Sequence, residues 1–541
     1  MRVFNTTGPV SCLKHYCLQP LERFDLKEIL FLIEQEKYFV LHAPRQTGKT
    51  TCMLALMEYL NNRDDYTCLY CNVEAAQAAR EDIGAAMAVI LDDMAQRADE
   101  YLNDGFLRDN IKEILSGSHL SALSSMLTKW CRRAEKPLVL ILDEIDSLVG
   151  DTLISVLRQL RSGYDKRPAS FPQTVILCGV RDIRDYRIHS SREKNIITGG
   201  SCFNIKAKSL RLGDFIKEQV FSLLELHQEE TGQIMEKATG EKIWELTNGQ
   251  PWLVNALAYE ACFEMKEGHD RGRPITCEMI EQAKENLINR RETHLHQLAD
   301  KLREERVRRV IGPMLSTGVE RFSYTEPDIQ YLIDLGLINR SRTGELSIAN
   351  PIYMEIIPRE LTWAEQSDIH EQTAWYVNSE GFLDMDRLLA KFQEFFREHS
   401  EHWMERFQYK EAGPQLLLQA FLQRIVNSGG RVEREYGLGR RRTDLLVIWD
   451  CRKTEDSIQR ANEGKGQRER QKVVIELKIL YKSLEKTIAD GLEQTAAYMD
   501  RCNAGEGHLV IFNRREDVRW EEKIFKREEG YEGKPIIVWG M

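Results

Sequence analysis

The stretch Tyr38–Thr51, YFVLHAPRQTGKTT, joins an apolar run to a glycine-containing loop and then to the start of a helix. A phosphate-binding loop needs inward-facing backbone N–H groups, a lysine and a hydroxyl, and the GKT at residues 48–50 supplies them at the required spacing. The dipole of the following helix favours anions at the same place. We therefore predict a nucleotide-phosphate site formed by Ala43, Pro44, Arg45, Gln46, Thr47, Gly48, Lys49, Thr50 and Thr51.

The loop departs from the pattern G-x-x-x-x-G-K-[ST] at its first position, where Ala43 replaces glycine. Alanine is small, so we expect the loop to bind phosphate nevertheless. The alternative is a chance GKT in a surface turn, which the flanking strand and helix patterns disfavour.

A second apolar run, Leu138–Asp146 (LVLILDEID), ends in carboxylates. Continuous apolar runs of this length are typical of parallel strands buried on both faces. At the end of such a strand, beside a phosphate-binding loop, Asp143 is expected to hold Mg²⁺ together with Thr50, and Glu144 to polarise the water that attacks the γ-phosphate. A solvated acidic cap at a strand end is the alternative interpretation of this pair.

The periodicity around these motifs predicts alternating helices and strands, and hence an α/β fold with a doubly wound parallel sheet. The predicted helices are Leu26–Glu36, Ala75–Leu102, Leu120–Ala134 and Leu153–Ser162, and the further predicted strands are Tyr66–Val73 and Thr174–Gly179.

The composition, with 541 residues of which 42% are hydrophobic and 30% charged, is that of a soluble protein with about three to four domains. No apolar run reaches the roughly twenty residues of a membrane helix, and the N-terminus lacks a signal-peptide pattern, so we expect a cytoplasmic protein without a membrane partner. The net charge of −10 argues against a generally basic nucleic-acid-binding surface. Two local basic patches, Arg290–Arg309 and Arg431–Asp444, remain candidates for nucleic-acid contact.

Twelve cysteines are scattered mainly through apolar segments, which predicts reduced core residues rather than a disulfide framework. The single CxxC, Cys68 and Cys71, falls on a predicted strand, where residues three apart face opposite ways. We therefore do not expect it to bind zinc.

Four segments, APRQTGKTT, LILDEID, CGVRD and TNGQPWLVN, resemble the archaeal-ATPase and STAND branch of AAA-related P-loop ATPases, over about residues 1–290. The resemblance implies ATP and Mg²⁺ as cofactors, Arg181 as the reader of the γ-phosphate, and Pro251 as a contact of the adenine. A salt bridge and a helix break are the plain alternatives for these two residues. No clear arginine-finger motif is present, so assembly into a homo-oligomer stays open.

Residues 301–362 resemble a winged helix, on the segments Arg306–Leu315, Glu326–Leu337 and the alternating Gly344–Met354. In STAND proteins such a domain follows the ATPase and packs against it. The segment DIQYLIDLGL carries two aspartates and no basic residue, which favours packing over DNA binding.

A second candidate site lies near the C-terminal end, on the predicted strands Leu445–Trp449 and Val473–Leu480, with a polar loop, Arg452–Gln471, between them. Asp444 opens the first strand, and period two places Glu476 and Lys478 on one face of the second. Two carboxylates and a lysine are what a Mg²⁺-dependent phosphodiester hydrolase requires. Alternating charges on a half-exposed strand are the alternative.

The pattern TD…ELK resembles the PD-(D/E)XK nucleases over about Tyr409–Asn513, with Thr443 in place of the usual proline. The resemblance implies a further metal-binding glutamate, Glu411, and an accessory pair, Gln494 and Tyr498, four residues apart on one helical face. An inactive nuclease fold kept for binding is the alternative.

Together these patterns predict an ATP-controlled, Mg²⁺-dependent DNA endonuclease that responds to an unknown trigger, in prokaryotic genome defence or control of mobile elements. Two alternatives stay open: a processive AAA-type motor nuclease, and a non-enzymatic ATP/ADP switch that binds DNA or another partner. The expected domains are an ATPase core (1–210), a helical lid (211–300), the winged helix (301–362), a helical connector (363–408), and the nuclease-like domain (409–541), which includes a predicted helix at Pro414–Val426.

Overall fold

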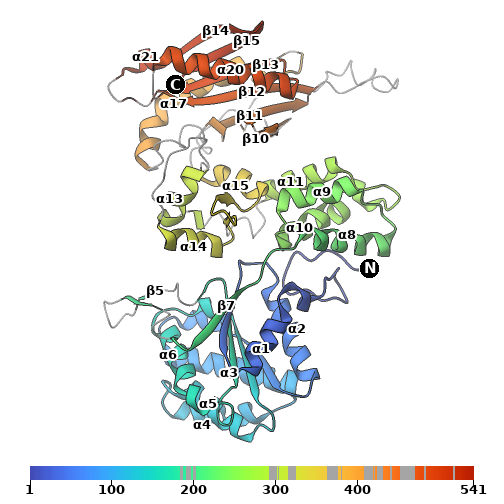
Figure 1. Ribbon diagram of the computed structural model, residues 1–541, viewed down its shortest axis with the longest axis vertical. Coiled ribbons are helices and arrows are strands. Elements are labelled where there is room, and N and C mark those ends of the chain that lie inside the picture. Colours follow the sequence, from blue (N-terminus) through green and yellow to red (C-terminus); the bar gives the residue numbers. More distant parts are fainter. Residues whose placement is uncertain are drawn as a thin grey trace. The chain divides into compact units, whose positions relative to one another are not determined.

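In the computed structural model, β1 (Tyr38–His42) belongs to a sheet of five parallel strands in the order β2-β3-β4-β1-β7. Figure 1 shows this sheet among the helices of the first unit, with β7 labelled. Phe39 of β1 pairs with Ile176 of β4, and Leu41 pairs with Leu210 of β7. Every residue of β1, β3 and β4 is buried, as expected for a parallel sheet covered on both faces. The predicted parallel sheet is therefore confirmed. Its other strands are β2 (Thr67–Asn72), β3 (Leu138–Asp143), β4 (Thr174–Gly179) and β7 (Lys206–Arg211).

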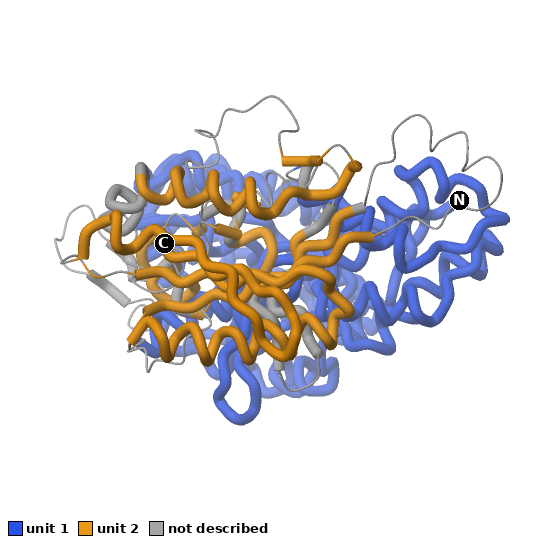
Figure 2. Tube along the Cα trace, turned by 90° about the horizontal axis from the view of Figure 1, so that it is seen from above, with its two compact units in different colours: residues 1–294, 325–353 blue, residues 295–324, 354–541 orange. Residues whose placement is uncertain are grey.

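The chain divides into two compact units, which Figure 2 distinguishes by colour. The first unit consists of residues 1–294 and 325–353, and the second of residues 295–324 and 354–541. The structure describes residues 1–182, 187–189, 196–198, 203–290, 301–302, 304–314, 325–361, 376–378, 380–406, 418–419, 421–422, 430–438, 441–450, 470–480, 483–513, 515 and 518–541.

Helices cover both faces of the parallel sheet, because alternate strand residues supply two separate cores. Phe39 packs in the core beneath α1 and α2, whereas Val40 packs in the core beneath α3 to α6. Cys68 and Cys71 likewise belong to opposite cores, as predicted from the strand period. The helices are α1 (Leu26–Glu34), α2 (Lys49–Asn62), α3 (Ile83–Leu102), α4 (Phe106–Ser116), α5 (Ala122–Arg133) and α6 (Gly150–Ser162).

The single helix expected at Ala75–Leu102 is wrong. The structure has a short 3-10 helix, η2 (Glu74–Ala79), and then α3, separated by Arg80 with a φ of 50°. The side chain of Asp82 accepts a hydrogen bond from the Ala85 N–H and so starts a new helix. Helix α4 was not expected. Further short elements are η1 (Pro20–Arg23), η3 (Ile145–Ser147), η4 (Tyr164–Lys166), β5 (Arg187–His189) and β6 (Ile196–Thr198).

A helical subdomain follows the sheet in the first unit. Its chain is interrupted at Gly249, which has a φ of +78°, and α10 restarts with Pro251 in its first turn, where the missing N–H costs nothing. The side chain of Gln250 caps this helix by accepting from the Leu253 N–H. The elements are α8 (Lys217–Thr231), α9 (Lys237–Thr247), α10 (Pro251–Tyr259), η6 (Glu260–Glu264), η7 (Lys266–His269) and α11 (Cys277–Arg290).

Residues 325–353 belong to the first unit although they come after part of the second. They contain α14 (Glu326–Asp334) and an antiparallel hairpin of β8 (Ile338–Arg340) and β9 (Leu346–Ile348). Within the alternating segment Gly344–Met354, only β9 is a strand, because the Asn350 side chain accepts from the Tyr353 N–H at the start of a helix. The flanking helices are α13 (Glu305–Met314) and α15 (Pro351–Leu361). A winged helix stays a prediction.

The second unit contains a mixed sheet in the order β10-β11-β12-β13-β15-β14. Strand β12 pairs antiparallel with β11 and parallel with β13. One face packs on α20, in a core that includes Val474, Leu492 and Leu509. The elements are α17 (Met385–Arg406), β10 (Gly430–Leu438), β11 (Arg441–Asp450), β12 (Arg470–Ile479), α20 (Leu484–Cys502), β13 (Glu506–Phe512), α21 (Trp520–Lys523), β14 (Phe525–Tyr531) and β15 (Lys534–Gly540).

The sequence does not predict strand β10. The predicted strand Leu445–Trp449 is present as part of β11, which extends beyond this apolar segment at both ends. The basic patch expected at Arg431–Asp444 forms part of the β10 and β11 hairpin. Most of the predicted loop Arg452–Gln471 and of the predicted helix Pro414–Val426 lies outside the described residues, as does most of the patch Arg290–Arg309.

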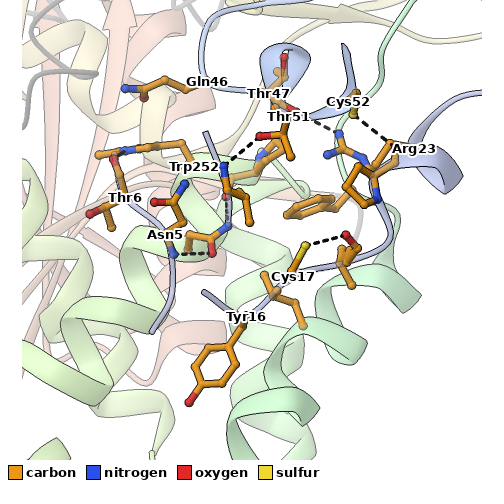
Figure 3. Close-up of a pocket in the computed structure, with 18 of the residues that line it drawn as sticks. Asn5, Thr6, Tyr16, Cys17, Arg23, Gln46, Thr47, Thr51, Cys52 and Trp252 are labelled. Carbon is orange, nitrogen blue, oxygen red and sulfur yellow. Dashed lines mark hydrogen bonds between the residues drawn. The ribbon is translucent and has the colours of Figure 1, made fainter. Parts of the chain in front are cut away.

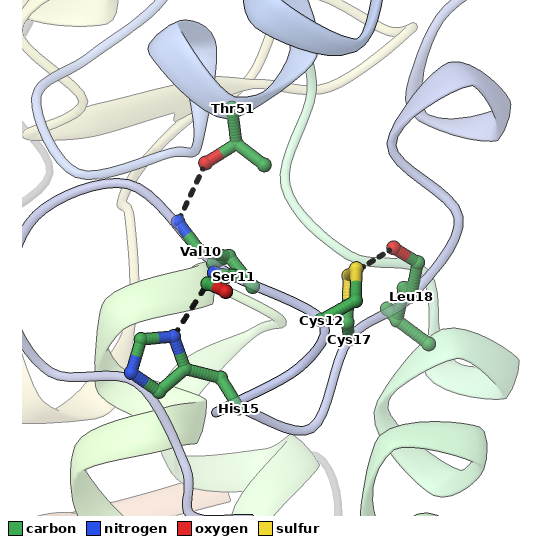
Figure 4. The surroundings of a disulfide bond; sticks show 7 residues. All are labelled: Val10, Ser11, Cys12, His15, Cys17, Leu18 and Thr51. Carbon is green, nitrogen blue, oxygen red and sulfur yellow. Dashed lines mark hydrogen bonds between the residues drawn. A yellow bond between two sulfur atoms is a disulfide. The ribbon is translucent and has the colours of Figure 1, made fainter.

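The expectation that all cysteines are reduced is wrong, because Cys12 and Cys17 form a disulfide (Figure 4). A local turn brings their Cα atoms to 5.1 Å, within the range that a disulfide can bridge. The other cysteines that the structure describes are free, and all of them except Cys277 are buried. None of the described helices combines the length and apolar character needed to cross a lipid bilayer.

Candidate functional site

The loop between β1 and α2 forms a compact cradle at the end of the parallel sheet. The Ala43 N–H donates to the Gly179 carbonyl oxygen at 3.1 Å, which fixes the start of the loop to β4. The Thr47 hydroxyl donates to the Pro44 carbonyl oxygen at 2.8 Å and closes the loop. Gly48 has a φ of +90°, in the left-handed region that glycine adopts without strain, and α2 begins at the next residue.

Lys49 lies inside this cradle and is only 5% exposed. Its ammonium donates to the carbonyl oxygens of Ala43 at 3.1 Å and Pro44 at 3.3 Å. Phosphate oxygens are stronger acceptors than neutral carbonyls, because they carry charge. A buried lysine held at the centre of the loop is therefore suited to bind a nucleotide phosphate at this position.

Asp143, the last residue of β3, is fully buried beside the first turn of α2. Its carboxylate accepts hydrogen bonds from the hydroxyls of Thr50 and Tyr70, each at 2.8 Å. The structure thus brings together the two predicted Mg²⁺-binding residues. A hard cation prefers this set of a carboxylate and a hydroxyl, so the residues present fit Mg²⁺. Tyr70 was not predicted, since nothing in its strand context marks it.

Glu144 adopts a left-handed backbone conformation, with a φ of 56° and a ψ of 39°. Non-glycine residues at such angles are uncommon, and they concentrate at functional sites. Burial raises the pKa of Glu144, and the nearby Lys49 ammonium opposes this shift. A carboxylate with a raised pKa is a better proton acceptor than an ordinary one, which suits the predicted activation of water.

Arg181 directly follows β4 and lies with its guanidinium carbon 5.0 Å from the centroid of the Tyr331 ring in α14. The same helix approaches the cradle at other points. The Ile333 carbonyl oxygen accepts from the Arg211 guanidinium at 3.1 Å, and a carboxylate oxygen of Asp334 lies 3.9 Å from Nδ1 of His42. The predicted γ-phosphate reader is therefore in contact with an element outside the ATPase sheet.

A pocket opens beside the cradle, between the N-terminal segment and α10 (Figure 3). Pro251, the predicted adenine contact, lines it together with Gln46, Thr47, Gly48 and Thr51 of the predicted loop. The pocket walls also include residues that were not predicted: Asn5, Thr6, Arg23, Phe215, Trp252 and Asn255.

Long-range contacts position these additional walls, which explains why the sequence does not reveal them. The Trp252 indole N–H donates to the Thr6 carbonyl oxygen at 2.9 Å. The Arg23 guanidinium lies 4.5 Å from the centroid of the Phe215 ring and donates to the Thr47 carbonyl oxygen at 3.2 Å. The N-terminal segment thereby becomes a wall of the pocket.

A second group of predicted residues lies on β12 and α20 in the second unit. The Lys478 ammonium donates to a carboxylate oxygen of Glu476 at 2.7 Å and to the side-chain oxygen of Gln494 at 2.5 Å. Glu476 is only 3% exposed. Tyr498 is buried on the same helix as Gln494.

The backbone of β11 places Asp444 at the end of the paired segment. Leu445 pairs with Ile475, so Asp444 and Glu476 are each the chain neighbour of one residue of this backbone pair. Glu411 lies outside the described residues. The metal-binding roles of these residues stay predictions.

The geometry of the first site defines a P-loop ATPase domain, and comparison with known proteins agrees. Residues 33–186 match the family model of the AAA domain. The match and the site together show an ATP-binding, AAA-type ATPase domain in the first unit. No curated protein matches the chain.

Several solved structures match the chain and share little sequence with it. The Walker-type ATPase PABY2304 of Pyrococcus abyssi is 15% identical, with a TM-score of 0.41, covering 63% of this chain and 99% of that one. Cdc6p from Pyrobaculum aerophilum is 18% identical, with a TM-score of 0.33, covering 64% and 94%. The RuvB Holliday junction branch migration motor of Thermotoga maritima is 13% identical, with a TM-score of 0.30, covering 60% and 93%.

Proposed function

We propose that this chain is an ATP-controlled, Mg²⁺-dependent DNA endonuclease, in which the AAA-type domain is the switch and the second unit cuts. The observation that carries the proposal is the ion pair of buried Glu476 with partly exposed Lys478 on a central strand, in which Gln494 also accepts from the lysine. A solvated strand face, the plain alternative, would leave this carboxylate in water, whereas Glu476 is 3% exposed. Burying a carboxylate is costly, so a charge kept there needs a partner or a task.

The side chains of the second unit suit phosphodiester hydrolysis. Asp444 and Glu476 would hold Mg²⁺, which would stabilise negative charge on the scissile phosphate. Lys478, fixed at two acceptors, would orient the attacking water or accept its proton. Gln494 sets the position of the lysine ammonium, which is the part we assign to this accessory residue.

The contacts of α14 support control by ATP. This helix and its hairpin pack on the ATPase core, while the chain on either side of residues 325–353 belongs to the second unit. Gly336 follows α14 so close to Pro44 that a Cβ at this glycine would lie 2.8 Å from the proline ring. We propose that ATP binding, by recruiting Arg181 to the γ-phosphate, changes the packing of α14 and thereby the second unit. A ligand can shift such an equilibrium only if it binds the two states with different affinity.

The same proposal includes the finer assignments made from the sequence. Residues 301–362 would act as a STAND-like winged helix with a packing role, in a cytoplasmic protein of genome defence or mobile-element control. The domain limits 1–210, 211–300, 301–362, 363–408 and 409–541 are part of it.

A cleavage assay on plasmid and linear DNA with Mg²⁺ tests the proposal, in the presence of ATP, ADP or a non-hydrolysable ATP analogue. We expect cutting that depends on Mg²⁺ and differs between ATP and ADP, with the analogue acting as ATP does. If cutting needs continuous ATP hydrolysis, and the ATP consumed grows with the length of DNA traversed, the chain is a motor nuclease. If DNA is bound but never cut with any divalent cation, it is a binding switch.

A further inference from the structure

The loop Cys12–Cys17 forms part of the wall of the nucleotide pocket (Figure 4). Cys17 lines the pocket directly, whereas Cys12 is exposed to solvent. The disulfide therefore connects an exposed residue with a residue of the pocket wall. Neither the sequence patterns nor the AAA family match assigns a role to it.

Two hydrogen bonds, one just before this loop and one within it, join the segment to elements that line the same pocket. On one side, the Val10 N–H donates to the Thr51 hydroxyl at 3.0 Å, in the first turn of α2. On the other side, the Tyr16 hydroxyl lies 3.0 Å from Nδ1 of His227 in α8, and both side chains are buried. The disulfide closes a loop that begins two residues after Val10 and contains Tyr16, so it restricts the segment that carries both contacts.

We propose that the Cys12–Cys17 disulfide is a redox-sensitive latch on the nucleotide pocket. In the oxidised form the cross-link keeps the pocket wall in its binding conformation, so ATP meets a preorganised site. In the reduced form the loop must be ordered at the expense of binding free energy, so affinity falls and nucleotide leaves faster. This inference rests on nucleotide binding at the P-loop and does not depend on the nuclease activity.

The chemistry of the latch is thiol–disulfide exchange with an external dithiol. A thiolate of the dithiol attacks the exposed sulfur of Cys12, forms a mixed disulfide and releases Cys17 as a thiolate, which takes up a proton. The second thiol of the reagent then displaces Cys12 and leaves as its own cyclic disulfide. Two electrons and two protons pass to the protein. The reduced Cys17 thiol can then donate to the Leu18 carbonyl oxygen, which lies 3.2 Å from its sulfur.

The experiment compares the affinity of the full-length protein for a fluorescent ATP analogue before and after treatment with dithiothreitol. We expect reduction to weaken binding by about tenfold, because a disulfide removes chain entropy that binding must otherwise offset. Equal affinity of the oxidised and reduced protein would overturn the latch. Absence of binding in both forms would overturn the nucleotide assignment and the latch with it.

Two variants separate the latch from general effects of the reductant. The double substitution Cys12→Ser and Cys17→Ser should bind as the reduced protein does, whatever the redox state. Cys277→Ser, which removes a free, half-buried cysteine of α11 outside the pocket, should keep the full response to dithiothreitol. A response that persists in the double variant, or disappears in the Cys277→Ser variant, would contradict the assignment.

Because ATP binding and disulfide reduction are thermodynamically linked, the reduction potential of the disulfide gives a second readout, independent of a binding assay. If the oxidised form binds ATP about tenfold more tightly, saturating ATP must stabilise the disulfide by the same factor. For a two-electron couple this tenfold factor lowers the reduction potential of Cys12–Cys17 by about 30 mV. Thiol labelling in dithiothreitol redox buffers, followed by mass spectrometry, measures the shift. An unchanged potential would overturn the latch even if the variants proved unstable.

Discussion

The guanidinium of Arg181 and the ring of Tyr331 form a cation–π contact, with 5.0 Å between the guanidinium carbon and the ring centroid. Such a contact is worth roughly 0.5 to 2 kcal/mol. A hydrogen bond from a guanidinium to a charged acceptor contributes about 1.5 to 3 kcal/mol. The two are similar in size, so a γ-phosphate can compete with the tyrosine ring for this arginine. Because the two energies are similar, binding of ATP can shift Arg181 from the Tyr331 ring to the γ-phosphate.

The first prediction tests this competition at both partners. We expect Tyr331→Leu to widen the preference for ATP over ADP by up to about fivefold, because Arg181 loses its competing ring. Tyr331→Phe is the matched control, since it keeps the ring face and should bind as wild type does. Arg181→Ala should narrow the preference by about tenfold. Calorimetric titration with each nucleotide measures these ratios, and an unchanged ratio in Arg181→Ala would make that residue purely structural.

The second prediction concerns the buried lysine of the P-loop. Lys49→Ala should weaken ATP binding by at least about a hundredfold, because the phosphates lose a charge-assisted partner inside the cradle. Lys112→Ala changes an exposed lysine of α4 and should bind ATP normally. Calorimetry distinguishes the two. Comparable affinity in both variants would show that phosphate does not enter this loop.

The third prediction concerns Glu144, whose pKa is raised by burial. Glu144→Gln should keep ATP binding and slow hydrolysis by about a hundredfold or more, because an amide cannot accept the proton of the attacking water. In the wild type, the acid limb of the ATPase pH profile should lie above the ordinary glutamate value of 4.5. Steady-state phosphate release measures both effects. Normal turnover by the variant would exclude Glu144 from the mechanism.

The raised pKa of Glu144 also predicts how the stability of the protein depends on pH. A carboxyl group whose pKa is raised by folding stabilises the protein at acid pH, and this contribution is lost as the pH rises through the raised pKa. Glu144→Gln should therefore raise the Tm near neutral pH, where the wild type buries a charge, and the gain should disappear at acid pH. Thermal unfolding at the two pH values compares them directly.

The local motifs of the first unit could be predicted because their chemistry resides in adjacent residues. Gly48, Lys49 and Thr50 occupy one turn, and the apolar run before Asp143 already defines a buried strand. Tyr70 and the Trp252–Thr6 contact could not be predicted in this way. Trp252 and Thr6 are 246 residues apart, so only the folded chain makes them neighbours.

In the second unit, too, the sequence predicts one feature of the sheet and misses another. The period of two in β12 placed Glu476 and Lys478 on one face, and the structure joins them by a hydrogen bond. Strand β10 was missed because its side chains are largely charged or polar and suggested a basic patch. Pairing with β11 satisfies its backbone whatever the side chains are, so hydrophobic periodicity contains little information about it.

The fourth prediction tests the packing of α14 against the P-loop through a glycine pair. Gly336 and Gly344 both have positive φ, at +74° and +88°, but only Gly336 lies against Pro44. Alanine at either position should lower the free energy of unfolding by about 1 kcal/mol through backbone strain alone. Gly336→Ala should cost more, and should also change the ATP affinity, because its Cβ pushes the helix away from the loop. Denaturant unfolding and calorimetry compare the variants. Equal effects of both would show that this contact carries no coupling.

The last prediction joins the two units through variants that act at only one of them. Glu476→Gln keeps the size of the side chain but removes the charge that would hold Mg²⁺ and that pairs with Lys478 at 2.7 Å. We expect it to reduce DNA cleavage by at least about a hundredfold while ATP binding is unchanged, and Asp444→Ala to do the same. Glu528→Gln, on the exposed edge strand β14, is the matched control and should cut normally.

Lys49→Ala supplies the decisive arm of this test, because it leaves every predicted metal-binding residue intact. If α14 transmits the nucleotide state, this variant should lose the difference in cleavage between ATP and ADP and remain at the rate of the nucleotide-free protein. Cleavage by Lys49→Ala that still responds to ATP would place the controlling nucleotide elsewhere. Cleavage by the wild type that is equal with ATP, with ADP and without nucleotide would mean that the two units are joined only by the chain. In that case the contacts of Arg181 and Gly336 with α14 and the P-loop would have a purely structural role.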